Sequence, residues 1–201
     1  MNTFNFIEEY KIDNQICDNF IKYFKKNKEY KKIGSCGEKG IVDTTIKNCT
    51  EAYFFNNSND KNIINFFNNL SKCLSSYVEK YNIKEKLLTQ FCNNIQYYNP
   101  KQGYPVLHYE RGEAFPARQL VYMLYCNTVT DKGGTEFPYQ NITLSAIKGK
   151  LVIWPAEFTH PHKGIISDTQ EKYIVTGWVE IKWIYLIITG ILHLQYPQRF
   201  V

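Results

Sequence analysis

The chain has 201 residues, 44% of them hydrophobic and 21% charged, and a formal net charge of +5. This length suits a single globular domain, and the modest, scattered positive charge disfavours nucleic-acid binding. The first residues contain neither a basic stretch nor an apolar stretch of the kind that directs secretion. Because the six cysteines also match no zinc-binding spacing, we expect a cytoplasmic protein with reduced thiols.

Residues 1–93 are expected to form an N-terminal helical support region. Apolar and polar residues alternate at 4–7, which predicts a short strand there. A helix then begins after Asp13, which stands where an N-cap would, and it ends in the basic run 25–28. The apolar residues that follow Asp13 at helical spacing are Ile16, Phe20, Ile21 and Phe24.

A second helix is expected over residues 60–81, after a loop at 34–53 that contains at most one short strand. One face of this helix is apolar, which predicts packing against the core and not a cofactor site. The stripe consists of Ile63, Ile64, Phe67, Leu70, Leu74 and Tyr77.

From about residue 94 the pattern changes to short β-type runs separated by turns, and residues 94–182 are expected to form the core of the protein. Two helices followed by a series of short strands indicate an α+β fold whose second half is a double-sheet jelly roll. The expected strands cover residues 95–98, 106–110, 118–127, 134–137, 142–146, 151–154, 160–166 and 172–181.

The C-terminal tail, residues 183–201, begins with an apolar stretch at 183–194. This stretch is too short to span a bilayer, which takes about 20 residues. We expect it to be a terminal element that covers an edge of the core. Membrane contact and a partner surface stay open as alternatives.

His108 and Glu110 are the first candidate ligands of a metal ion. On a strand, side chains two residues apart point to the same side, so the imidazole and the carboxylate would converge. Two histidines and one carboxylate form the facial triad of non-haem Fe(II) oxygenases, which leaves coordination positions open. The third ligand would be His160 or His162, and strand alternation does not choose between them.

These candidates belong to an ordered set with fixed spacings. Tyr98 stands ten residues before His108, and Lys172 stands ten residues after His162. The members in chain order are Tyr98, His108 with Glu110, the strand residue Tyr125, the glycine turn at 133–137, His162 and Lys172. In this pattern the sequence resembles the 2-oxoglutarate- and Fe(II)-dependent dioxygenases, specifically their prolyl 4-hydroxylase-like branch.

The resemblance implies a double-stranded β-helix with the N-terminal helices packed on one sheet. It implies that His108, Glu110 and His162 bind Fe(II), because the interval to Lys172 selects His162. His160 then becomes a pocket residue near the metal.

The resemblance also implies a binding site for the co-substrate 2-oxoglutarate. Lys172 would bind the distal carboxylate of 2-oxoglutarate, and Tyr125 would hydrogen-bond the same carboxylate. Tyr98 would lie nearer the metal. Gly133 and Gly134 are expected to serve the turn conformation and not the chemistry.

The implied reaction is hydroxylation of an unactivated C–H bond, with 2-oxoglutarate and O2 as co-substrates and succinate and CO2 as products. Glu110 argues against the related halogenases, which lack this carboxylate. The substrate would be a peptide or protein, with a prolyl residue as one candidate, or a small molecule, and ascorbate is a candidate further ligand. Arg111, Arg118 and Lys163 stand near the motifs, where they could meet an acidic or peptide substrate. A catalytically idle jelly-roll binding module and a cupin-like metalloenzyme remain as alternatives.

Overall fold

The structure, a computed structural model, describes residues 4–27, 29, 31–37 and 40–182. These residues include the helices α1 (Asn14–Lys26) and α2 (Lys61–Lys80). The strands are β1 (Glu8–Lys11), β2 (Lys31–Ile33), β3 (Thr50–Phe55), β4 (Leu87–Thr89), β5 (Cys92–Tyr98), β6 (Arg118–Tyr125), β7 (Thr135–Phe137), β8 (Ile142–Leu144), β9 (Lys150–Pro155), β10 (Lys163–Gly164) and β11 (Lys172–Ile181).

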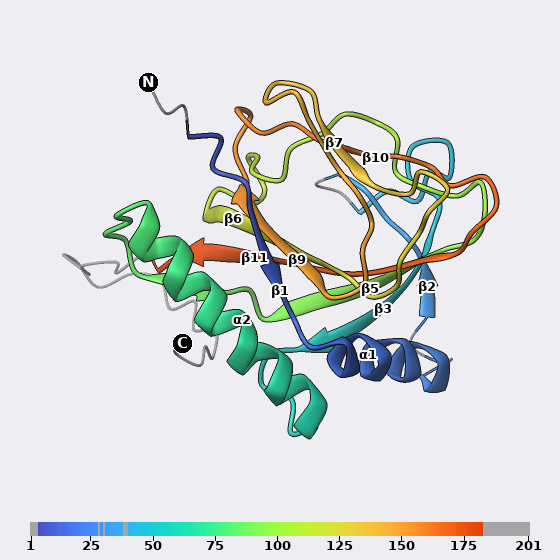
Figure 1. Cartoon of the computed structure of the whole chain (residues 1–201), viewed down its shortest axis with the longest axis horizontal. Coiled ribbons are helices and arrows are strands. Elements are labelled where there is room, and N and C mark those ends of the chain that lie inside the picture. Colours follow the sequence, from blue (N-terminus) through green and yellow to red (C-terminus); the bar gives the residue numbers. More distant parts are fainter. Residues whose placement is uncertain (1–3, 28, 30, 38–39, 183–201) are drawn as a thin grey trace, which may run out of the picture.

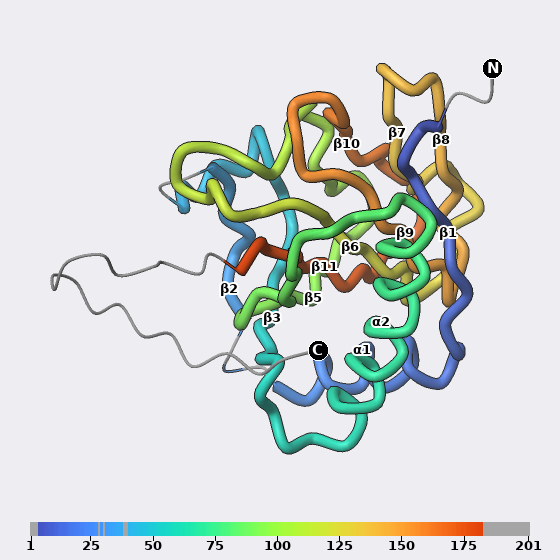
Figure 2. Tube along the Cα trace, turned by 90° about the vertical axis from the view of Figure 1, so that its left-hand side faces the viewer, coloured from blue at the N-terminus to red at the C-terminus, as the bar shows by residue number. Residues whose placement is uncertain are grey.

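The strands form two antiparallel sheets. The larger sheet has eight strands in the order β1-β9-β6-β11-β5-β3-β2, with β4 also paired to β11. The smaller sheet has the order β10-β7-β8. Figure 1 shows α1 and α2 on one side of the larger sheet, and Figure 2 shows β7, β8 and β10 on the other side. This arrangement confirms the expected α+β jelly roll with helices packed on one sheet.

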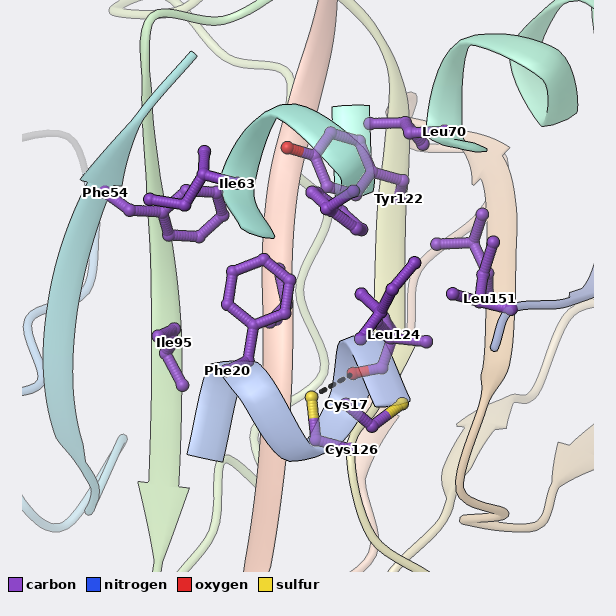
Figure 3. Close-up of a cluster of buried hydrophobic side chains, with 14 of the residues drawn as sticks. Cys17, Phe20, Phe54, Ile63, Leu70, Ile95, Tyr122, Leu124, Cys126 and Leu151 are labelled. Atoms are coloured by element: carbon purple, nitrogen blue, oxygen red, sulfur yellow. Dashed lines mark hydrogen bonds between the residues drawn. The ribbon is translucent and has the colours of Figure 1, made fainter. Parts of the chain in front are cut away.

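The helices cover the outer face of the larger sheet with a continuous apolar core. Phe20 of α1 and Phe66 of α2 meet edge to face, with ring centroids 4.9 Å apart, and both contact Phe54 of β3. Figure 3 shows this layer, in which side chains from the helices lie over β3, β5, β6 and β9. A second apolar cluster lies between the two sheets and includes Val121, Met123, Phe137 and Trp154.

Both predicted helices are confirmed, and the first begins at the predicted cap Asp13; the N-cap of the second is Asp60, the first residue of its expected range. The Asp13 side chain accepts a hydrogen bond from the backbone of Gln15 at 2.8 Å. The Asp60 side chain accepts one from the backbone of Asn62 at 2.7 Å. These bonds satisfy donors that would otherwise be unpaired in the first turn of each helix.

The predicted apolar face of α2 is wrong at one position. Ile64 is 42% exposed, whereas Phe66, which was not in the predicted stripe, is fully buried. Phe67 is partly buried at the edge of the contact. The buried series Ile63, Phe66, Leu70, Leu74 and Tyr77 follows three- and four-residue steps, and Ile64 falls on the solvent side of it.

Two predicted strands do not form. Residues 4–7 are not a strand, because Phe6 has φ 57° and the extended backbone begins only at Glu8. Residues 106–110 contain only an isolated bridge between His108 and His162. Among the other predicted strands, 118–127 ends at Tyr125, and 160–166 reduces to β10.

Residues 1–93 contribute more strand than the sequence indicated, since β1 to β4 all join the larger sheet. The predictions for the tail, including membrane contact at 183–194, lie outside the described residues. Within the part of the chain that the structure describes, no helix is both long and apolar enough to cross a membrane.

Candidate active site

A cavity of about 580 Å³ lies between the two sheets. This volume is in the range of small-molecule sites. Its floor is the inner face of the larger sheet, where alternate residues of a strand point to the same side. The residues of β11 that line it are Lys172, Ile174, Thr176 and Trp178.

Three side chains in this cavity converge in a way that suits a metal ion. His108, Glu110 and His162 each offer a ligand atom, and these atoms all lie within 4.8 Å of one another. Oε1 of Glu110 is 3.5 Å from Nε2 of His108 and 3.7 Å from Nε2 of His162. Two imidazole nitrogens and one carboxylate oxygen are the donor set of non-haem Fe(II) sites.

A pair of backbone hydrogen bonds brings the two histidines together across a long stretch of chain. The amide of His108 donates to the carbonyl of His162 at 3.0 Å, and the amide of His162 donates back at 2.8 Å. The amide of Glu110 donates to the carbonyl of Ala156 at 3.1 Å. The predicted convergence of His108 and Glu110 therefore occurs, but through this bridge and not through a regular strand.

The protonation states suit cation binding. Burial lowers the pKa of His162, so its imidazole is neutral at neutral pH and has a lone pair to give. Burial tends to raise the pKa of Glu110, but hydrogen bonds and charge from His108 and His162 hold this pKa well below the usual range. Glu110 is therefore ionised.

His160 lies apart from the three converging side chains. Its Nε2 is 2.9 Å from the carbonyl oxygen of Asn5, and its Nδ1 is 2.9 Å from the hydroxyl of Thr159. Its carbonyl oxygen is 3.1 Å from Nδ1 of His162. Both ring nitrogens of His160 thus have partners within the protein, and the residue supports His162 through its backbone.

Lys172 marks the other end of the cavity. It is 5% exposed, and its ammonium donates to the carbonyl of Gly133 at 3.0 Å. Among the described residues it makes no salt bridge to a carboxylate, and burial lowers its pKa to about 8. A buried cation without a counter-ion fits an anionic ligand.

The two tyrosines of the predicted set also lie in this cavity. The hydroxyl groups of Tyr125 and Thr135 are 2.6 Å apart, and Tyr125 is fully buried. The ring of Tyr98 lies 4.9 Å from the ammonium of Lys172, and its hydroxyl donates to Gln96. Tyr98 therefore contacts Lys172.

The three basic residues considered for substrate contact each lie within reach of a glutamate of the protein. Arg111 pairs with Glu157, and Lys163 lies 3.2 Å from Glu136. The guanidinium of Arg118 is buried and approaches Glu110 at 3.6 Å.

Sequence reasoning missed one buried ion pair in the cavity wall. Lys47 and Glu51 are 6% and 1% exposed, and their charged groups are 2.5 Å apart. The hydroxyl of Tyr53 donates to the second oxygen of Glu51 at 2.9 Å. The four-residue spacing of opposite charges was visible in the sequence, but the region was interpreted as a loop, where such a pair is usually solvated.

Comparison with known proteins agrees with this geometry. Residues 93–180 match the family model of the 2OG-Fe(II) oxygenase superfamily. No curated protein matches the sequence.

Several solved structures share the fold at low identity. A viral collagen prolyl hydroxylase from Paramecium bursaria Chlorella virus-1, in complex with 2OG, has 18% identity and a TM-score of 0.67, over 89% of this chain and 97% of that one. A prolyl-4-hydroxylase of Pseudomonas putida has 14% identity and a TM-score of 0.69, over 87% and 92%. A prolyl hydroxylase from Trichoplax adhaerens, in complex with a hypoxia inducible factor peptide fragment, has 14% identity and a TM-score of 0.71, over 88% and 84%.

Proposed function

We propose that this chain is a 2-oxoglutarate- and Fe(II)-dependent dioxygenase in which His108, Glu110 and His162 bind the Fe(II). The match of residues 93–180 to the 2OG-Fe(II) oxygenase family model supports the reaction class, and the fold shared with prolyl hydroxylases agrees with it. The observation that carries this assignment is the convergence of three ligand atoms of the right chemical types within 4.8 Å. Two nitrogens and one oxygen leave further coordination positions for co-substrates.

Lys172 is the proposed anchor for the distal carboxylate of 2-oxoglutarate. The support is its buried ammonium, which makes no salt bridge to a carboxylate among the residues that the structure describes. Tyr125 and Thr135 offer hydroxyl groups from neighbouring walls, and Tyr98 packs against the same ammonium. A dianionic ligand would balance the positive charges of the metal ion and of the Lys172 ammonium. Burying these two charges would then cost less free energy.

When bound, the metal with 2-oxoglutarate and O2 would supply the oxidising chemistry, in which one oxygen atom enters a C–H bond and the other enters succinate, with release of CO2. The chain supplies the geometry. His162 is held by its backbone bridge to His108, and Glu110 is held in its ionised form beside them. Apolar residues, which include Val121 and Met123, form part of the cavity wall.

The proposed substrate is a peptide or protein, with a prolyl residue as the first candidate for hydroxylation. Prolyl hydroxylases are the structural neighbours, and one of them is in complex with a peptide fragment. Around the metal ligand His108 of this chain, the side chains of Val106, Leu107 and Tyr109 are 43%, 45% and 52% exposed. Exposed apolar side chains in the segment that carries His108 suit contact with an extended peptide. Free amino acids and other small molecules are the alternative substrate class.

We also propose a cytoplasmic location. All six cysteines are unpaired in the structure, as expected in a reducing compartment. Reduced surroundings also keep iron in the ferrous state, and ascorbate is the candidate reductant that would do so during turnover.

The test is production of succinate from 2-oxoglutarate by the purified protein. We expect slow formation without substrate, dependent on both Fe(II) and O2, and faster formation with a suitable peptide. Paired peptides that differ only by Pro→Ala identify a prolyl substrate, because only the proline form would gain an oxygen atom in the mass spectrum. Omission of ascorbate tests its role. Succinate formation that persists after removal of iron would contradict the proposal, and an idle binding module would form none.

A further inference from the structure

The two carboxylate oxygens of Glu110 have different surroundings. Oε1 faces the histidines, at 3.5 Å from His108 and 3.7 Å from His162. Oε2 instead accepts a hydrogen bond from the indole Nε1 of Trp178 at 3.0 Å, and it lies 3.6 Å from Nη1 of Arg118. One oxygen is thus directed toward the candidate metal position, and the other is occupied by donors of the protein.

The position of Trp178 follows from the register of the larger sheet. Trp178 lies on β11 opposite Val121 of β6, and it shares the cavity face with Lys172 and Thr176. Glu110 approaches it from a segment that is not part of any sheet. The hydrogen bond from Trp178 therefore connects an irregular segment to a central strand.

The guanidinium of Arg118 packs on the indole of Trp178 and also contacts Glu110. This guanidinium lies 3.8 Å from the ring centroid of Trp178 and 3.8 Å from that of Phe115, and Arg118 is 6% exposed. Nη1 donates to the backbone carbonyl of Glu110 at 3.3 Å, and Nη2 donates to the side chain of Gln90 at 3.3 Å. A planar cation that is stacked and hydrogen-bonded in this way has little freedom to turn.

Glutamate needs such support more than a shorter ligand would. Ordering a glutamate side chain costs up to about 2 kcal/mol in rotamer entropy. A free carboxylate can also bind a cation through both oxygens, which would use a coordination position that a co-substrate needs. A hydrogen bond to Oε2 orders the side chain before the metal binds, and it also keeps Oε2 from binding the cation.

We infer that Trp178 and Arg118 are positioning residues, which hold Glu110 so that it binds the metal through Oε1 alone. This inference rests on the proposed role of Glu110 as a metal ligand. It predicts that Trp178 and Arg118 affect metal affinity even when no substrate is bound.

Binding of Co(II) to the full chain, without 2-oxoglutarate, tests the inference independently of activity. Trp178→Phe keeps an aromatic ring over Arg118 and removes the indole N–H. We expect Co(II) affinity to fall by about 10- to 100-fold, as is typical when a partner of a metal ligand is lost. Trp154→Phe controls for a smaller ring beside the site, because the ring of Trp154 lies 5.0 Å from that of His162 while its indole N–H has no hydrogen-bond partner among the described residues. We expect it to lose less Co(II) affinity than Trp178→Phe, since it removes packing next to a ligand but no hydrogen bond to one.

A double-mutant cycle shows whether Trp178 acts through Glu110. In a Glu110→Ala background, Trp178→Phe should change the residual Co(II) affinity by less than about threefold, since the partner of the indole is already absent. An equal loss in both backgrounds would overturn the inference. Arg118→Met keeps an unbranched side chain next to the rings of Phe115 and Trp178 but removes the guanidinium. It should weaken Co(II) binding when Glu110 is present and have little effect in the Glu110→Ala background.

The outcomes separate this inference from the proposed function. If the wild type fails to bind Co(II), the metal assignment itself is wrong. If the wild type binds Co(II) and folded Trp178→Phe binds equally well, the metal assignment stands and the positioning role is overturned. Circular dichroism and thermal unfolding of each variant establish that the comparison is between folded proteins.

Discussion

His160 and His162 are only two residues apart, yet their rings contact different partners. Nε2 of His162 lies 3.7 Å from Glu110, whereas Nε2 of His160 lies 2.9 Å from the carbonyl oxygen of Asn5. Both side chains are buried, at 6% and 5% exposure, so burial alone would not distinguish them. The partners of their Nε2 atoms do distinguish them.

The first prediction follows from this difference. His162→Ala should abolish iron binding at micromolar metal, because it removes one of three proposed ligands. His160→Ala should leave much of the iron binding. It should instead loosen the N-terminal segment, because the contact between the His160 ring and the carbonyl oxygen of Asn5 is lost. Anaerobic Fe(II) titration compares the two variants, and proteolysis near the N-terminus reports the second effect. The reverse order of iron affinities would show that His160 is the ligand.

The second prediction concerns the face that α2 buries. Phe66→Ala should destabilise the protein by about 3–5 kcal/mol, because it leaves a cavity between the helices and the sheet. Ile64→Ala should change stability by about 0.5 kcal/mol or less, since that side chain is 42% exposed. Urea unfolding of the two variants measures the contrast. Similar losses would mean that α2 is rotated relative to the structure described above.

The sequence predicted features that depend on short-range patterns. The cap at Asp13 and the periodic apolar residues after it are local, and the structure confirms that helix. The position of Phe66 was missed because Ile64 and Phe67 made an equally apolar stripe on a neighbouring line of the same helix. Only the partner sheet decides which line is buried.

Features that depend on distant partners were harder to predict. The segment 106–110 was predicted to be a strand, but its partner is the single residue His162, and such a bridge leaves no periodic signal. Strand β3 pairs with β5 about forty residues later, so Glu51 on it was not expected to face the cavity. The candidate site residues were proposed from their fixed intervals, which resemble those of a family, and the structure brings His108, Glu110 and His162 of that set together.

The third prediction concerns the buried pair of Lys47 and Glu51. Glu51→Leu would leave the Lys47 ammonium buried without its anion and should cost about 3–5 kcal/mol. The double variant with Lys47→Met removes both charges, and it should recover most of that loss because the desolvation cost is removed as well. Equilibrium unfolding in urea compares the three proteins. A double variant as unstable as Glu51→Leu would show that packing, and not charge, sets the cost.

The fourth prediction tests the co-substrate anchor. Lys172→Ala should weaken 2-oxoglutarate binding by roughly 30- to 4000-fold, which corresponds to about 2–5 kcal/mol for loss of one partner of a buried charge pair. Affinity for Fe(II) should change little, since Lys172 is not among the three metal-binding candidates. Anaerobic titration, followed by the visible absorption of the 2-oxoglutarate chelate, measures both constants. Binding within about threefold of the wild type would refute the anchor assignment.

The last prediction concerns the pH dependence of the same site. Burial lowers the pKa of Lys172 to about 8, so the free protein loses the ammonium as pH rises through that value. Only the charged form attracts the distal carboxylate, and binding of the dianion must therefore raise this pKa. The apparent dissociation constant for 2-oxoglutarate should then increase by about tenfold between about pH 7 and about pH 9. Lys172→Arg keeps its charge over this range, because the pKa of arginine is above about 12. The longer, planar guanidinium fits a site shaped for lysine less well, so 2-oxoglutarate should bind this variant more weakly at every pH, but with an affinity that is nearly independent of pH. An equal pH dependence in the two proteins would assign the titration to another group and remove Lys172 as its cause.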